Sequence, residues 1–143
     1  MNSLPDETSF VHYLQDSLTH MQGECPPAYA QLCQLLAPRQ VQLSVDREEL
    51  WMGFAPAAIS VQPGQAANAS VHIRLPRQVI LDMLDAKLTL QDAILTGRVS
   101  LQGDLHHLTL FYEGWLTYLR GAVRCPSIPD LLERYRYVSS PVE

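Results

Sequence analysis

Hydrophobic and polar residues first alternate and then follow helical spacing along residues 69–104. Val71, Ile73 and Leu75 occupy one side of an extended segment whose other side is polar, a pattern typical of a half-buried strand. The next apolar residues, from 79 to 84, follow helical spacing. A second short helix is predicted over Leu90–Thr96, and alternation returns over Arg98–Gln102. The pattern therefore predicts strand, helix, helix and strand in that order.

Residues that begin and end helices stand at the joints between these elements. Pro76 opens the first helix, because the missing amide hydrogen of proline costs nothing in a first turn. Thr89 is the expected cap of the second helix, and Gly97 ends it in a left-handed conformation. Gly103 then turns the chain into a third helix, for which Asp104 is the expected N-cap.

The preceding residues predict two helices and three antiparallel strands. The first helix follows an acidic start at Asp6 and Glu7, and breaks at Gly23 and Pro26 separate it from the second, which ends near Pro38. Alternation then predicts strands over residues 41–45, 50–54 and 59–61. The apolar stripe of the first helix comprises Phe10, Val11, Leu14, Leu18 and Met21.

The ordered block from Lys87 to Asp104 resembles the sterol carrier protein type-two family. Its lysine-leucine turn, short helix, glycine-basic pair, alternating strand and glycine-aspartate pair follow one another as they commonly do in that family. The close resemblance covers residues 69–104, and a looser one extends back to Val41 and forward through the following helix. Ala86 departs from the pattern, since the family often has glycine before the lysine-leucine turn.

This resemblance implies a single small α/β (α+β) domain over residues 1–143. A mixed five-stranded sheet would carry helices mainly over one face and enclose an apolar tunnel or cavity. Members of the family bind sterols, fatty acids, acyl-CoA or other lipids there without covalent chemistry, and some relatives are accessory proteins in quinone or natural-product biosynthesis. The C-terminal segment, residues 126–143, would be a helical cover near the tunnel mouth.

The third helix carries more apolar surface than one buried face requires, since about 100° of arc is enough. We expect the surplus to be covered by the rest of the chain, by a ligand or by a second subunit. One stripe comprises Leu105, Leu108, Tyr112, Trp115, Leu116 and Leu119, and the other comprises Phe111, Trp115 and Tyr118.

A short amphipathic helix is predicted in the C-terminal segment, between and beyond the prolines at 126 and 129. It is too short to be stable alone in water, so we expect it to dock on the aromatic residues of the third helix. Whether it gates a cavity or only packs on the body is left open. Its apolar stripe comprises Ile128, Leu131, Leu132 and Tyr135.

Apolar positions on three successive helices are the candidates for a cavity wall, because all three helices should face one sheet. Met83 suits an adaptable wall, since its thioether chain is flexible. Tyr112 or Trp115 is the candidate for one orienting polar contact, since each carries a donor on an apolar body. The candidate ligand-binding residues are Val79, Met83, Leu90, Ile94, Leu108, Phe111, Tyr112 and Trp115.

No residues show the spacing of a catalytic or metal site. His106 and His107 are adjacent, so on a helix they point in different directions and do not form a metal-binding pair. A capping role explains Asp104 better than a catalytic pairing with His107. We therefore expect no catalytic residue, no metal and no cofactor.

Composition narrows the class of partner and the compartment. A net charge of −5, with Lys87 as the single lysine, argues against binding to nucleic acid and against docking on anionic membranes. No apolar run approaches the length of a membrane span, and the first ten residues lack the features of a signal peptide. The cysteines at 25, 33 and 125 are odd in number, which fits free thiols in a reducing cytoplasm.

These observations and the resemblance favour non-enzymatic binding or carrying of an apolar small molecule in an internal cavity. The ligand class that the resemblance implies is lipid, sterol, fatty acyl, or isoprenoid or polyketide-like. The alternative is a biosynthetic accessory enzyme that uses the same cavity to orient a reactive intermediate. A third reading is a dimerisation or scaffold module, so a homodimer or an enzyme partner is left open.

Overall fold

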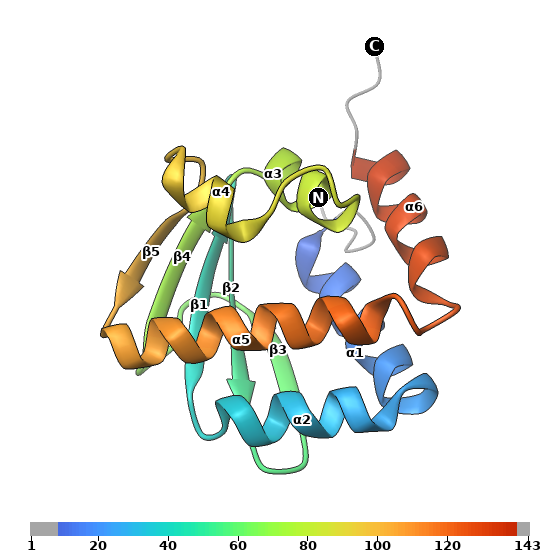
Figure 1. The fold of residues 1–143 in the computed structure, drawn as a ribbon, viewed down its shortest axis with the longest axis horizontal. Coiled ribbons are helices and arrows are strands. Elements are labelled where there is room, and N and C mark those ends of the chain that lie inside the picture. The colour runs from blue at the N-terminus through green and yellow to red at the C-terminus, as the bar shows by residue number, and fades with distance from the viewer. Residues whose placement is uncertain (1–8, 140–143) are drawn as a thin grey trace.

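The computed structural model describes residues 9–139, which form a mixed five-stranded sheet and six helices (Figure 1). In chain order, the elements are α1 (Phe10–Glu24), α2 (Pro26–Leu36), β1 (Gln40–Val45), β2 (Glu48–Phe54), β3 (Ile59–Pro63), β4 (Val71–Leu75), α3 (Arg77–Leu84), α4 (Leu90–Leu95), β5 (Ser100–Gly103), α5 (Leu105–Ala122) and α6 (Ile128–Ser139).

The sheet has the strand order β3-β2-β1-β4-β5. Strand β4 runs parallel to β1, and the other three neighbouring pairs are antiparallel. Short turns join β1 to β2 and β2 to β3, α3 and α4 connect β4 to β5, and the parallel pair is joined by a longer path through β2, β3 and the following loop. The predicted mixed five-stranded sheet is confirmed.

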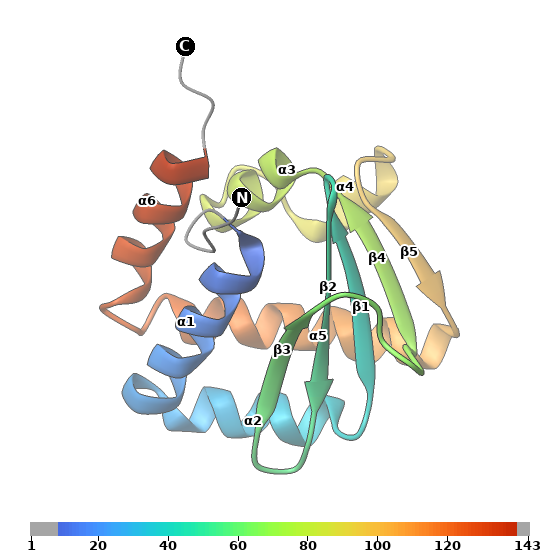
Figure 2. The ribbon, with the colours of Figure 1, turned by 180° about the vertical axis from the view of Figure 1, so that it is seen from behind.

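Helices α2 and α5 cross the same face of the sheet, and both lie behind it when the molecule is viewed from the other side (Figures 1 and 2). Strand β4 shows why: Val71, Ile73 and Leu75 are buried under the helices, while His72 and Arg74 are exposed. The predicted placement of helices mainly over one face is confirmed, and the core lies between the two layers.

Most of the predicted helix ends are present. The Thr89 hydroxyl accepts a hydrogen bond from the Asp92 amide at 3.0 Å, and Gly97 is left-handed with φ 78°. Asp104 stands at the N-cap of α5 as predicted, although its side chain makes no capping hydrogen bond. The expected acidic start at residues 6 and 7 lies outside the described residues, and Ser9 caps α1 by accepting from the His12 amide.

Helix α5 is buried most deeply along a face that shares only Tyr118 with the predicted stripes. Two glycines let α2 approach closely: a methyl group at Gly121 would lie 2.6 Å from the Cβ of Ala28, and one at Gly114 would lie 2.7 Å from a methyl of Leu36. The buried face therefore runs along these glycines, and Leu105 at the helix start is 80% exposed.

Helix α6 packs against α1 rather than on the aromatic residues of α5, where its docking was predicted (Figure 1). The ring of Tyr135 lies 5.3 Å from that of Tyr13 and 5.9 Å from that of Phe10, measured between centroids. Arg136 also forms two 2.8 Å hydrogen bonds to the carboxylate of Asp85, just beyond α3. Pro129 lies inside the first turn of α6 and not in the break before it.

Candidate ligand-binding site

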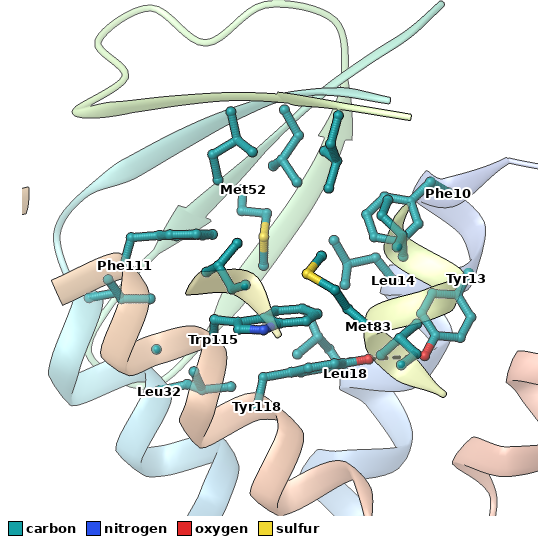
Figure 3. Close-up of a pocket in the computed structure, with 18 of the residues that line it drawn as sticks. Phe10, Tyr13, Leu14, Leu18, Leu32, Met52, Met83, Phe111, Trp115 and Tyr118 are labelled. Carbon is teal, nitrogen blue, oxygen red and sulfur yellow. Dashed lines mark hydrogen bonds between the residues drawn. The ribbon is translucent and has the colours of Figure 1, made fainter. Parts of the chain in front are cut away.

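An apolar pocket of about 90 Å³ lies between the inner face of the sheet and the helices. Figure 3 shows Phe10, Tyr13 and Leu14 of α1 on one side of it, with Phe111 and Trp115 of α5 on the other. Helical spacing explains this arrangement, because residues three and four apart project from the same face of a helix. Each helix therefore presents one continuous apolar wall.

The strands and α3 supply the rest of the wall. Leu43, Met52 and Ile73 occupy inward positions on three neighbouring strands, because alternate residues of a strand project to the same face. From the helix layer, Met83 of α3 and Leu90 of α4 also reach the pocket. None of the residues that line it is charged, so the wall of the pocket is apolar throughout.

A chain of buried hydroxyl groups lies at one side of the pocket. The hydroxyl oxygens of Tyr13 and Tyr118 are 3.2 Å apart (Figure 3). Tyr118 donates to Ser17 at 2.9 Å, and Ser17 donates to the Leu14 carbonyl at 3.1 Å. Burial raises the pKa of both tyrosine hydroxyls above the ordinary value. Both groups therefore stay neutral at physiological pH.

The eight residues predicted to bind ligand divide into two groups. Met83, Leu90, Phe111 and Trp115 line the pocket. Val79 is buried but is not among the lining residues. Ile94, Leu108 and Tyr112 are partly buried and pack against the core outside the lining set.

The wall contributed by α1 was absent from the sequence-based candidates. Its residues Phe10, Leu14 and Leu18 had been recognised only as a core stripe, because apolar residues around a cavity and in a solid core have the same pattern. One signal was available in Tyr13 and Ser17. They are two hydrogen-bonding residues four positions apart beside that stripe, and a buried hydroxyl needs a partner.

The pocket is smaller than a typical ligand site, which has a volume of about 300–1,000 Å³. A lipid-sized molecule would therefore need the walls to move apart. Met52 and Met83 project into the space from opposite layers, as Figure 3 shows, and unbranched thioether chains change conformation easily. These two side chains are the adaptable part of the wall.

Residues 9–139 contain no group of three or more histidine, cysteine, aspartate or glutamate side chains that could hold a metal ion. Within the same residues, no helix is both long enough and apolar enough to cross a bilayer.

His107, one of the two adjacent histidines, accepts a 3.0 Å hydrogen bond from Arg39 at its Nδ1.

The fold and the pocket define a small α+β protein with an apolar site between a sheet and its helices. The profile of the SCP-2 sterol transfer family matches residues 18–112, which is more than half of the chain. The chain therefore belongs to this family, and membership indicates lipid binding or transfer. No curated protein sequence matches the chain.

Solved structures share the fold at low sequence identity. UbiJ-SCP2, a ubiquinone synthesis protein, is 16% identical, with 85% of this chain and 98% of that chain covered and a TM-score of 0.63. Sterol carrier protein domain 2 of Helicoverpa armigera is 15% identical, with 85% and 96% covered and a TM-score of 0.58. Sterol carrier protein 2 of Yarrowia lipolytica, in its apo form, is 14% identical, with 84% and 95% covered and a TM-score of 0.54.

Proposed function

We propose that this protein binds and carries an apolar small molecule in the pocket between the sheet and the helices, without covalent chemistry. The ligand class is lipid, sterol, fatty acyl, or isoprenoid or polyketide-like. The observation that carries the proposal is a pocket with no charged residue in its lining. Burial stabilises such a complex: a ligand that hides about 300 Å² of apolar surface gains about 7 kcal/mol, before the cost of immobilisation.

Four of the sequence-predicted residues would contact the ligand directly, and four would support them from behind. The direct contacts are Met83, Leu90, Phe111 and Trp115, which line the pocket. The supporting residues are Val79, Ile94, Leu108 and Tyr112, which pack beside it. Substitutions of the direct-contact residues should therefore lower ligand affinity more than substitutions of the supporting residues.

A bulky substitution in the wall tests the proposal. Met83→Trp should fill the adaptable side of the pocket and weaken binding of the neutral dye Nile red by about tenfold or more. Leu95→Trp is the matched control, because Leu95 is 74% exposed and lies outside the pocket. Native mass spectrometry of the purified protein should also show a co-purified apolar compound. Unchanged dye affinity in a folded Met83→Trp protein would contradict the wall assignment.

A second candidate function is an accessory role in quinone or natural-product biosynthesis. It is favoured by the likeness to UbiJ-SCP2, which is described as a ubiquinone synthesis protein. In that role the pocket would hold an apolar intermediate and orient it for chemistry, either alone or with a partner enzyme. An isoprenoid or quinone precursor in the native mass spectrum would favour this function, whereas a mixture of ordinary fatty acyl lipids would favour the carrier.

We also propose that residues 1–143 act as one unit in which the C-terminal segment covers the pocket. Tyr135 of α6 contacts Phe10 and Tyr13, and both of these residues line the pocket. These contacts support the covering role, because they join α6 to one wall of the pocket. The described cysteines are free thiols, as is usual in reducing compartments, and this supports a cytoplasmic place of action.

A further inference from the structure

We propose that the pocket selects apolar ligands that carry a hydroxyl group, and that this group donates a hydrogen bond to the phenolic oxygen of Tyr13. The inference rests on the proposed function, because it assumes that a ligand enters this pocket. It adds a chemical class to that function: an alcohol or a phenol, in preference to a ketone, an ester or a carboxylate.

The direction of the buried hydrogen-bond chain carries the argument. The Leu14 carbonyl can only accept, so Ser17 donates its one proton there. The Ser17 oxygen then accepts from Tyr118, which uses the one proton of that tyrosine. The Tyr118 oxygen in turn accepts from Tyr13 across 3.2 Å. All three protons therefore point away from Tyr13 and towards the Leu14 carbonyl.

Tyr13 stands at the open end of this chain. Its proton is committed to Tyr118, while no described residue donates a hydrogen bond to its oxygen. The oxygen is thus an unfilled acceptor in apolar surroundings, since the ring is almost fully buried and packs against those of Phe10 and Tyr135. Such a group gains from a donor and gains nothing from another acceptor.

The same geometry disfavours the other oxygen-containing head groups. A ketone or an ester has only acceptors, so its oxygen would be buried without a partner. A carboxylate would in addition lose its hydration with no cation in the pocket lining. Both tyrosine hydroxyls also stay protonated, because burial raises their pKa. An alcohol meets neither penalty.

A ligand hydroxyl reaches Tyr13 only when the pocket widens beside it. The walls of the pocket are apolar, and the two hydroxyl groups face each other at its side (Figure 3). Met83 projects into the pocket in the same view. Rotation of its flexible chain is the movement that would open a path to the Tyr13 oxygen.

The experiment compares three ten-carbon probes: 1-decanol, 2-decanone and decanoate. Trp115 lines the pocket and reports binding by its fluorescence, and a Trp51→Phe background removes the signal of the other tryptophan. In this background, Tyr13→Phe should lower the affinity for 1-decanol about three- to tenfold and leave the affinity for 2-decanone unchanged. Comparing each probe with itself cancels its own cost of leaving water.

Two further variants sharpen the test. Tyr135→Phe is the matched control, because Tyr135 lies in the same aromatic cluster, while its hydroxyl is not part of the chain. It should leave the affinity for all three probes unchanged. Tyr118→Phe removes the acceptor of the Tyr13 proton, which can then turn to the ligand. This variant should therefore bind 2-decanone about three- to tenfold more tightly than the parent does.

The outcomes separate this inference from the function on which it rests. If no probe binds to the parent protein, the proposed function fails. If 1-decanol and 2-decanone both bind and Tyr13→Phe weakens them equally, the inference is wrong while the carrier function stands. If Tyr13→Phe does not fold, as judged by circular dichroism, Tyr118→Phe decides: unchanged affinity for 2-decanone overturns the inference.

Discussion

Ala86 holds a backbone conformation that glycine adopts more readily. Its φ is 63°, in the turn that connects α3 with α4. For a residue with a Cβ, the left-handed region costs about 1–2 kcal/mol. This is the position at which the sequence departs from the glycine common in its family, so the departure carries a cost in stability rather than a change of fold.

Ala86→Gly should therefore stabilise the protein. Relief of the left-handed strain outweighs the greater freedom of glycine in the unfolded chain, for a gain of about 0.5–1 kcal/mol. Urea unfolding followed by circular dichroism measures the change. Ala30→Gly, on an exposed helical position of α2, is the control of opposite sign and should lose about 0.5–1 kcal/mol. A loss of stability in both variants would contradict the strain at Ala86.

The two glycines of α5 fix how closely α2 and α5 pack. Gly121→Ala should place a methyl group 2.6 Å from the Cβ of Ala28, so one helix must shift. We expect a loss of about 1–3 kcal/mol in the free energy of unfolding. Gly23→Ala in α1 is the matched control, since nothing lies within 4 Å of its added methyl group. Equal stability in the two variants would mean that the helices are less closely packed than described.

The ion pair between Asp85 and Arg136 is expected to hold α6 in place. Hydrogen bonding to Arg136 lowers the pKa of Asp85 below its ordinary value. A lowered pKa contributes stability that is present above the ordinary carboxyl pKa and is lost as pH falls through the lowered one. Amide exchange in α6 should therefore rise under strongly acidic conditions while remaining low at neutral pH.

Asp85→Asn should raise amide exchange in α6 at neutral pH and speed ligand release, because the charge that holds Arg136 is gone. Glu133→Gln is the control, since Glu133 is more exposed and lies 3.6 Å from the same guanidinium. The control should stay close to wild type, because exposed ion pairs contribute little. Faster amide exchange in α6 with an unchanged rate of ligand release would contradict the covering role of this helix.

For the whole molecule, periodicity predicts the sheet, the helices and the face they cover, because alternation and helical spacing follow directly from backbone geometry. The pocket is harder to predict. Met83 and Trp115, which helical spacing predicts for a cavity wall, line the pocket, but the α1 wall is not predictable in this way because Phe10 and Leu14 have the pattern of ordinary core residues. The docking of α6 on α1 could not be predicted either: its predicted stripe is largely buried, but an apolar stripe does not specify the helix on which it packs.

The volume of the pocket also gives the protein a mechanical property. About 90 Å³ of apolar space is present in the folded chain and disappears when the chain unfolds, so hydrostatic pressure favours unfolding. A ligand that fills the space removes much of this volume difference. We expect 1-decanol to raise the pressure at which half of the protein unfolds, as measured by Trp115 fluorescence. The protein without ligand should therefore be the more compressible of the two states, and its compressibility should fall when 1-decanol binds.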